Sequence, residues 1–125
     1  MTCGPILIVD DNQANLKLAR VLLVGEGYEV RTAVDAEQAL EVLETYRPKL
    51  ILMDLQLPSM DGLALTRLLK SNPATRDIVV IALTAYAMRG DDEKARASGC
   101  AGYITKPIDT RTLASRVAGF LAAGG

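Results

Sequence analysis

Apolar and polar positions follow two different periods along this chain, and the two periods alternate five times. Short apolar runs rich in β-branched residues are typical of strands, and they lie at 5–10, 28–33, 49–54, 77–85 and 101–107. Each run precedes a segment with the three-to-four-residue spacing of a helix face. These segments are 12–27, 35–48, 63–73, 89–100 and 109–125. The pattern predicts five strand–helix units.

The spacing also predicts which side of each helix faces inward. The expected inward residues are Leu16, Ala19 and Leu23 in the first helix, Ala36, Ala39, Leu40 and Leu43 in the second, Leu65, Leu68 and Leu69 in the third, and Leu113, Val117, Phe120 and Leu121 in the last. Asp35 is placed to cap the second helix. The helix at 89–100 has few apolar residues, so we expect it to be weakly anchored and free to move.

Strands buried on both faces and joined through helices are typical of a parallel sheet with helices on each side and right-handed crossovers. The predicted fold class is therefore α/β, a doubly wound five-stranded parallel sheet with five helices. The alternating run at 28–33 is typical of an edge strand that is wet on one side. A chain of 125 residues is expected to form a single domain over 1–125.

Composition changes this picture mainly by excluding functions. A net charge of −1 gives no electrostatic reason to bind nucleic acid or an anionic membrane. The chain contains no histidine, which excludes a histidine base, a histidine metal ligand and a phosphohistidine. The sequence has neither a membrane-spanning apolar stretch nor a signal-peptide pattern, so we expect a cytoplasmic protein. Cys3 and Cys100 match no metal-ligand spacing and are expected to be free thiols.

Side chains capable of chemistry stand where four of the predicted strands end: Asp10 with Asp11, Asp54, Thr84 and Lys106. In an open parallel sheet the site lies beyond the carboxyl ends of the strands, so these side chains should converge. Clustered carboxylates resist joint ionisation unless a cation joins them, and Mg²⁺ suits a site of few carboxylates and several waters. A carboxylate in such a site can attack a phosphoryl group, while the cations neutralise the phosphoryl oxygens.

Each of these residues also has a plainer interpretation. The alternatives are a helix cap for Asp10, Asp11 or Asn12, a turn residue for Asp54, a local hydroxyl hydrogen bond for Thr84 and a solvated surface position for Lys106. Any one of them alone would be unremarkable. Their common placement at the same end of the predicted sheet favours a functional site.

The whole chain resembles the receiver domain of two-component response regulators, the CheY-like family. The matching motifs are VDDN at 9–12, LILMDLQLPSMDG at 50–62, ALTAYA at 82–87 and ITKP at 104–107. The segment at 84–100 is also similar to single-domain cell-division regulators and to receivers of hybrid sensor kinases. The resemblance implies a flavodoxin-like sheet with strand order 2-1-3-4-5, for which CheY is itself a standard example.

The resemblance implies roles for individual residues. Asp54 is the expected phosphoacceptor, and Asp10, Asp11, Asp54 and the backbone carbonyl of Gln56 are the expected Mg²⁺ ligands. Pro58 and Gly62, which follow Asp54, are expected to turn the chain away and leave the carboxylate accessible.

The remaining implied roles concern the response to phosphorylation. Thr84 and Lys106 are expected to bind the phosphoryl group, Tyr103 to change rotamer together with Thr84, and the peptide bond before Pro107 to be cis. The implied function is a phosphorylation-activated switch that catalyses only its own phosphorylation and dephosphorylation. The implied partners are a histidine kinase or histidine phosphotransfer protein, and a downstream protein bound through the fourth helix, the fifth strand and the fifth helix.

Other classes of protein fit less well. A phosphatase of the haloacid dehalogenase type would need a second acid where Gln56 stands. A flavodoxin-like electron carrier would need a phosphate-cradling loop where the acidic DDNQAN lies at 10–15. A receiver-like scaffold would have lost Asp54, one acid of the pair or Lys106. A receiver cut from a larger hybrid kinase or effector protein stays an alternative, and the sequence names neither the kinase nor the output partner.

Overall fold

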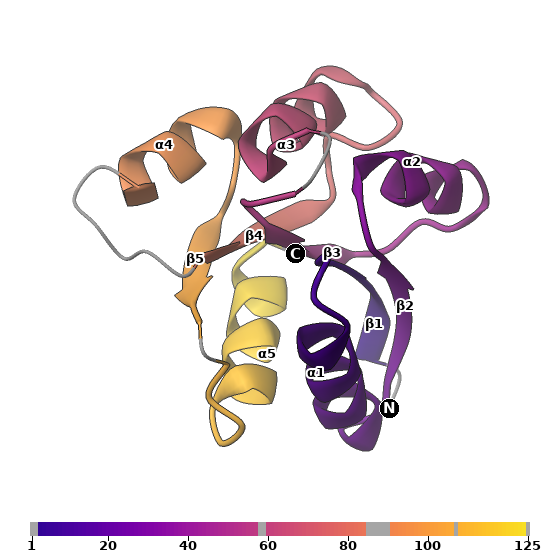
Figure 1. Cartoon of the computed structure of the whole chain (residues 1–125), viewed down its shortest axis with the longest axis vertical. Helices are drawn as coiled ribbons and strands as arrows, with labels where there is room; N and C mark the ends of the chain where they lie inside the picture. Colours follow the sequence, from indigo (N-terminus) through magenta and orange to yellow (C-terminus); the bar gives the residue numbers. More distant parts are fainter. Residues whose placement is uncertain (1–2, 58–59, 85–90, 107, 125) are drawn as a thin grey trace.

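The computed structural model of the chain describes residues 3–57, 60–84, 91–106 and 108–124. All ten predicted elements are present in the predicted order (Figure 1). They are β1 (Cys3–Val9), α1 (Gln13–Gly25), β2 (Tyr28–Ala33), α2 (Ala36–Thr45), β3 (Leu50–Asp54), α3 (Gly62–Ser71), β4 (Val79–Thr84), α4 (Asp91–Ser98), β5 (Gly102–Thr105) and α5 (Leu113–Gly124).

The five strands form one parallel sheet with the order β2-β1-β3-β4-β5, which confirms the predicted fold class. Helices α2, α3 and α4 cover one face of the sheet, and α1 and α5 cover the other (Figure 1). β2 is an edge strand, as predicted, with Glu29 and Arg31 exposed between the buried ends Tyr28 and Ala33. β5 forms the opposite edge.

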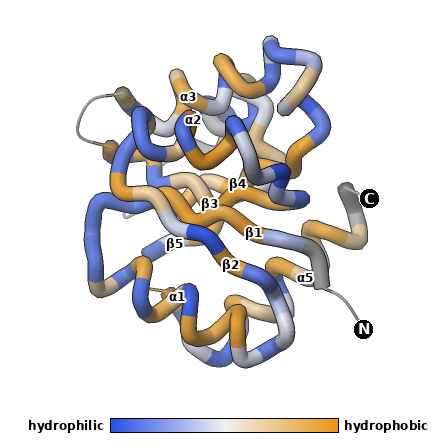
Figure 2. The backbone as a smooth tube through the Cα atoms, turned by 90° about the vertical axis from the view of Figure 1, so that its right-hand side faces the viewer, coloured by the Kyte–Doolittle hydropathy of each residue, from blue (hydrophilic) through white to orange (hydrophobic). Residues whose placement is uncertain are grey.

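Side-chain alternation along the strands divides the apolar residues into two cores. In β1, Leu7 and Val9 belong to the core under α2 and α3, whereas Ile6 and Ile8 belong to the core over α1 and α5. Figure 2 shows the result, with largely hydrophobic central strands lying between helices in which hydrophobic and hydrophilic residues alternate. All five residues of β3 are buried, so this strand is held by both cores.

Most of the predicted inward residues are buried, namely Leu16, Ala19, Leu23, Ala36, Ala39, Leu43, Leu65, Leu69, Leu113 and Val117. Leu40, Phe120 and Leu121 are partly buried against the two cores. The prediction for Leu68 is wrong, because this side chain is 46% exposed. Leu65, Thr66 and Leu69 form the inner face of α3, so Leu68 lies on its flank, beside a shallow hollow shared with α2.

Side-chain caps set where the helices begin. Asn12, Asp35 and Asp61 precede α1, α2 and α3, and the side chain of each accepts a hydrogen bond from a backbone N–H in the first turn of its helix, as helix starts require. The Asp35 cap confirms the prediction. α5 begins at Leu113 rather than at 109, because the Asp109 carbonyl accepts the N–H groups of Thr112 and Leu113 and forms a turn first.

Gly62 is required by a close approach of two backbones. The Gly62 N–H donates to the Leu55 carbonyl at 3.1 Å. A Cβ at position 62 would lie 2.9 Å from the Leu55 Cα and closer still to the Asp54 carbonyl oxygen. The start of α3 therefore packs directly on the end of β3. Pro58, the other residue expected to turn the chain, lies outside the described residues. None of the described helices has the length and apolar character needed to cross a membrane.

Candidate functional site

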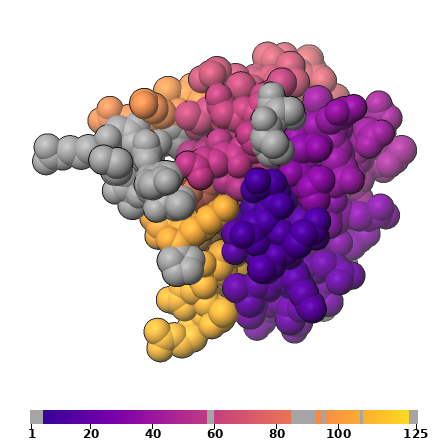
Figure 3. All heavy atoms as spheres, in the orientation of Figure 1, coloured from indigo at the N-terminus to yellow at the C-terminus, as the bar shows by residue number. Residues whose placement is uncertain are grey.

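The register of the sheet brings the predicted site residues together. Val9 pairs with Met53, so the residues that follow them, Asp10 and Asp54, lie side by side at the carboxyl ends of β1 and β3. Thr84 pairs with Thr105 at the ends of β4 and β5, and Lys106 follows. Figure 3 shows atoms from the beginning, middle and end of the chain, coloured indigo, magenta and orange, meeting on one face.

Strand alternation decides which way these side chains point. Ile8, Leu52 and Ile104 face the core over α1 and α5. The residues two positions further along their strands are Asp10, Asp54 and Lys106, and they point to the same side because strand side chains repeat with a period of two. Thr84 lies two positions after Ala82 in β4, and Ala82 faces the core under α2 and α3. The Thr84 side chain therefore points to the side of the sheet that α2 and α3 cover.

Backbone hydrogen bonds hold both carboxylates in place. The Asp10 N–H continues the β1–β2 ladder by donating to Ala33 O at 3.0 Å. Asp10 Oδ1 accepts the Asn12 N–H at 2.9 Å, and Asp54 Oδ1 accepts the Gln56 N–H at 3.0 Å. In each aspartate, Oδ1 is thus held by the backbone N–H of the residue two positions later in the sequence. The other oxygen, Oδ2, is left to face the site.

Lys106 lies between the two fixed aspartates. Its Nζ is 3.1 Å from Asp10 Oδ2 and 3.1 Å from Asp54 Oδ2. The Lys106 N–H donates to Thr84 O at 2.7 Å, which extends the β4–β5 ladder to this residue. Since only 17% of the Lys106 side chain is exposed, the solvated-surface alternative for this lysine is wrong.

One oxygen in this cluster is incompletely satisfied. Asp10 Oδ2 is buried and accepts no well-aligned hydrogen bond from the described residues, although the Lys106 ammonium lies 3.1 Å away as an ion-pair partner. Asp11 is exposed beside it, and ligand oxygens of Asp10, Asp11 and Asp54 lie within 4.8 Å of one another. Three carboxylates and one ammonium leave an excess of two negative charges. A divalent cation with oxygen ligands fits this site, because it would satisfy the buried oxygen and neutralise the excess charge.

The surroundings shift the ionisation of the two buried partners. Burial is the main cause that raises the pKa of Asp54, and the charge of Asp10 adds to it, while the Gln56 N–H and Lys106 oppose the rise. Burial by itself would lower the pKa of Lys106, but the carboxylates of Asp10 and Asp54 outweigh it, and the pKa is raised. The ammonium therefore stays charged, whereas the Asp54 carboxylate is more basic than an exposed one.

The structure separates two interpretations of the acidic segment after β1. Asn12 is the cap of α1, since its side-chain oxygen accepts the Asn15 N–H at 3.1 Å. Asp10 and Asp11 make no such bond and stay available for a ligand. Asp54 does form a local turn with Gln56, but this bond uses only one of its two oxygens. The role of the Asn12 N–H in fixing Asp10 was not anticipated from the sequence.

The other predicted site residues are placed as follows. Gln56 is exposed two residues beyond Asp54, Thr84 is buried at the end of β4, and Tyr103 is partly buried against the core under α2 and α3. The metal-binding role of the Gln56 carbonyl and the rotamer change at Tyr103 stay predictions. Pro107, with its predicted cis peptide bond, lies outside the described residues.

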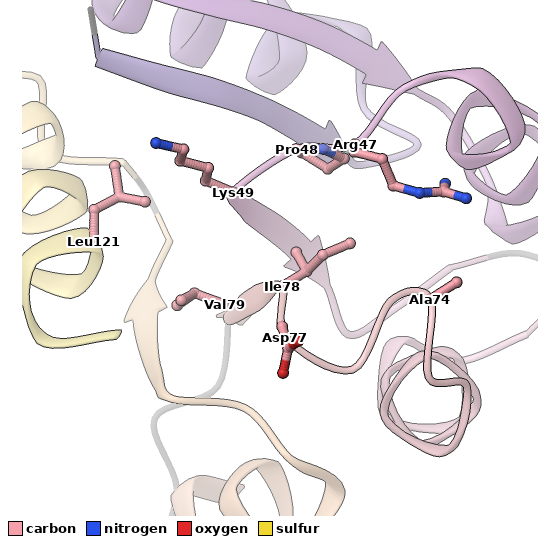
Figure 4. Close-up of a pocket in the computed structure, with 8 residues that line it drawn as sticks. All are labelled: Arg47, Pro48, Lys49, Ala74, Asp77, Ile78, Val79 and Leu121. Atoms are coloured by element: carbon pink, nitrogen blue, oxygen red, sulfur yellow. The ribbon is translucent and has the colours of Figure 1, made fainter. Parts of the chain in front are cut away.

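A hollow of about 320 Å³ lies at the opposite, amino-terminal end of β3 and β4. Figure 4 shows that the charged ends of Arg47, Lys49 and Asp77 point in different directions around it. Binding sites need polar groups that converge on a ligand, and the groups here diverge. The carboxyl end of the sheet is therefore the candidate site.

Comparison with known proteins identifies the family. Residues 6–118 match the response regulator receiver domain. This chain belongs to the response regulator receiver domains. It is 43% identical over 116 residues to the polar-differentiation response regulator DivK of Brucella anthropi, which covers 93% of this chain and 94% of DivK.

Solved structures agree with this assignment. The receiver domain of a signal transduction histidine kinase from Syntrophus aciditrophicus superposes with a TM-score of 0.86 at 36% identity, over 97% of this chain and 92% of that one. The chemotaxis response regulator CheY4 of Vibrio cholerae gives a TM-score of 0.90 at 25% identity, over 95% and 99% of the two chains.

Membership in this family confirms the predicted class of function. Receiver domains are signalling switches of two-component systems rather than conventional enzymes, and they interact with histidine kinases and downstream effectors. The haloacid dehalogenase alternative finds no support in the comparisons.

Proposed function

We propose that this receiver domain accepts a phosphoryl group on Asp54 and that the phosphorylated form binds a downstream partner. The observation that carries the proposal is the arrangement of Asp54 beside Asp10 and Lys106. Asp54 is held rigidly by the sheet and by the Gln56 N–H, and its Oδ2 faces the Lys106 ammonium at 3.1 Å. A fixed carboxylate oxygen next to a cation is suited to attack a phosphoryl group.

We infer that the metal is Mg²⁺ and that it is held by Asp10, Asp11, Asp54 and the Gln56 carbonyl. The unbonded Asp10 Oδ2 and the three convergent carboxylates support this assignment. Mg²⁺ would be bound weakly, because the chain offers few ligands and the ion keeps several of its waters. When bound, the ion supplies neutralisation of the phosphoryl oxygens during transfer.

The transfer itself needs no further reagent. The donor is a phosphohistidine of a histidine kinase or a histidine phosphotransfer protein, and acetyl phosphate can replace it in vitro. The Asp54 carboxylate attacks phosphorus, a P–O bond forms, and the P–N bond of the donor breaks, so that the imidazole leaves with the bonding electron pair. Attack by water on the acyl phosphate later returns the carboxylate and releases inorganic phosphate. The chain thus catalyses only its own phosphorylation and dephosphorylation.

The switch is proposed to run through Thr84 and Lys106. Lys106 pairs with Asp10 and Asp54, so a phosphoryl group on Asp54 would draw its ammonium away from Asp10. Thr84 and Lys106 are joined by a backbone hydrogen bond of 2.7 Å, so β4 and β5 would respond together. We propose that Tyr103 follows this movement and that α4, β5 and α5 form the face that binds the downstream protein.

Intact mass spectrometry after incubation with Mg²⁺ and acetyl phosphate tests the proposed acceptor. The wild type should gain one phosphoryl group, and Asp54→Asn should gain none. Asp11→Ala should lose both Mg²⁺ binding and metal-dependent labelling. Asp61→Asn is a matched control, because asparagine also caps a helix and Asp61 serves as the cap of α3. Equal labelling of Asp54→Asn and wild type would exclude Asp54 as the acceptor.

A further inference from the structure

The inner face of α3 carries a polar side chain among apolar ones. Leu65 and Leu69 are buried on that face, as in any amphipathic helix, and Thr66 beside them is fully buried as well. Threonine is a weaker helix former than leucine, and a hydroxyl removed from water costs free energy unless it finds hydrogen-bond partners. Helix propensity and apolar packing give no reason for a threonine here, so the reason lies in its contacts.

The Thr66 hydroxyl has a partner on each side. Its Oγ1 donates to the carbonyl oxygen of Gly62 at 2.7 Å and accepts a hydrogen bond from the Cys100 thiol, whose Sγ is 3.9 Å away. Burial raises the pKa of Cys100, so the thiol keeps its proton and acts as the donor. A hydroxyl has a single proton. Because the thiol points at the oxygen of Thr66, that proton is directed to Gly62.

Gly62 is the residue of α3 that packs on the end of β3. Its N–H donates to Leu55 O at 3.1 Å, and its Cα lies so close to the Asp54 carbonyl that no side chain would fit. The Leu55 N–H donates in turn to Leu83 O of β4 at 3.1 Å. The end of β3 is therefore held by the sheet on one side and by the first turn of α3 on the other. The Thr66 hydroxyl anchors that turn from within the helix.

This contact between α3 and β3 borders the residue that orients Asp54. Gln56 follows Leu55 in the chain, and its N–H donates to Asp54 Oδ1 at 3.0 Å. The other oxygen of Asp54, Oδ2, faces the Lys106 ammonium at 3.1 Å. A change in the contact of Gly62 with Leu55 would displace Gln56 and turn the Asp54 carboxylate. Small misplacements of a reacting group slow a reaction.

We propose that Thr66 is a positioning residue for phosphoryl transfer to Asp54, acting through Gly62 and assisted by Cys100. This inference rests on the proposed function, because it concerns the reactivity of Asp54. The Thr66 hydroxyl contacts no reacting atom. It holds the first turn of α3 in place, so that Gln56 fixes one carboxylate oxygen while the other stays directed into the site.

A second buried threonine provides a matched control. Thr75 follows the other end of α3, and its Oγ1 donates to Leu69 O, also at 2.7 Å. Thr66→Val and Thr75→Val each remove one buried hydrogen bond from a hydroxyl to a carbonyl of α3, and each keeps the branched shape of the side chain. If Thr66 only stabilised the helix, both variants would lower the urea midpoint and neither would change phosphorylation.

The rate at which acetyl phosphate and Mg²⁺ label Asp54, followed by intact mass spectrometry, separates the two roles. At saturating Mg²⁺, Thr66→Val should be labelled about fivefold more slowly, the factor that one neutral hydrogen bond is worth. Thr75→Val should be labelled at the wild-type rate. Thr66→Ser keeps the hydroxyl and should be labelled at the wild-type rate, whatever the lost methyl group costs in stability. Cys100→Ala should slow labelling less than Thr66→Val, because a thiol is a weak donor.

Hydrogen exchange followed by NMR gives a readout that does not depend on labelling. The amides of Gln56 and Gly62 should exchange faster in Thr66→Val than in wild type, and they should not do so in Thr75→Val. Wild-type labelling of Thr66→Val would overturn the proposal. So would equal slowing in Thr75→Val, or labelling of Thr66→Ser that is as slow as that of Thr66→Val.

The variant Asp54→Asn keeps this proposal apart from the proposed function. If Asp54→Asn is not labelled and Thr66→Val is labelled like wild type, Asp54 is the acceptor and the positioning role of Thr66 is contradicted. If Asp54→Asn is labelled like wild type, the proposed function fails and the role of Thr66 fails with it. Loss of labelling in Asp54→Asn together with slow labelling in Thr66→Val alone supports both.

Discussion

Helices α3 and α4 cover the same face of the sheet, yet they are attached in different ways. α3 buries Gly62, Leu65, Thr66 and Leu69 and is capped by Asp61. Of the α4 side chains that the structure describes, Glu93, Lys94, Arg96 and Ala97 are exposed and only Ser98 is buried. Apolar packing therefore anchors α3, whereas the described side chains of α4 make their contacts through polar groups near its end.

The polar attachment of α4 can be traced to two residues. Ser98 Oγ donates to Lys94 O at 2.9 Å and accepts from Arg67 Nη1 of α3 at 3.2 Å. Gly99 ends the helix with a φ of +109°, and a Cβ there would lie 2.6 Å from the Lys70 side chain. Segments held by few apolar contacts open at low free energy. Asp54, the proposed phosphoacceptor, thus lies beside α3, whose inner face is buried. The proposed output face includes α4, whose described side chains are mostly exposed.

The largest expected effect is at Leu65 of α3. The side chain is fully buried, so Leu65→Ala removes packed atoms and leaves a cavity at a cost of about 2–5 kcal/mol. Urea unfolding followed by circular dichroism measures the loss. A loss below about 1 kcal/mol would mean that α3 is no better anchored than α4.

Much of this comparison was accessible from the sequence, because it rests on local patterns. The apolar runs and the helical spacing predicted every element, and the scarcity of apolar residues in 89–100 agrees with the exposure of most described side chains of α4. The acids and the lysine at strand ends predicted the site, since parallel topology brings such ends together.

What the sequence could not supply are contacts that depend on how elements pack. The buried Asp10 Oδ2, the Arg67–Ser98 link and the seating of Phe120 on Gly102 each join residues from different elements or depend on the exact depth of a strand end. Lys70 is a further case, because its Nζ donates to Ile78 O at 2.6 Å although its helical position alone predicts a solvated lysine. The error at Leu68 has the same origin, since spacing cannot tell the centre of a helix face from its flank.

The second prediction concerns the charge of Asp54, which lies beside the start of α3. The pKa of Asp54 is raised above 3.8, so in the window above 3.8 the folded chain keeps a proton that the unfolded chain has lost. Metal-free wild type should therefore lose stability relative to Asp54→Asn as pH rises through that window, by about 1.4 kcal/mol for each unit of the rise in pKa. Thermal unfolding from pH 4 to 8 measures the difference. A stability difference between wild type and Asp54→Asn that stays constant from pH 4 to 8 would contradict the raised pKa. Added Mg²⁺ should stabilise wild type more than the variant.

The third prediction concerns the attachment of α4 through Ser98. Ser98→Ala removes both the Arg67 link and the bond to Lys94 O, and we expect a loss of about 1 kcal/mol. Hydrogen exchange should show faster opening of α4, with α3 little changed. Ser71→Ala is the matched control, because this exposed serine of α3 makes a similar local bond to Leu68 O at 2.9 Å. Uniform acceleration in both helices would show that α4 does not open by itself.

The smallest change in the free energy of unfolding is expected at Leu68, one turn after Leu65 in α3. Leu68 is 46% exposed on the flank of the helix, and its side chain borders only the shallow hollow shared with Leu40 and Leu43 of α2. Leu68→Ala should change the free energy of unfolding by about 0.5 kcal/mol, because alanine suits a helix at least as well and little packing is lost. The same urea titration that measures Leu65→Ala measures this variant. A loss as large as that of Leu65→Ala would place Leu68 on the inner face, as its spacing predicted, and would overturn the assignment of that face to Leu65, Thr66 and Leu69.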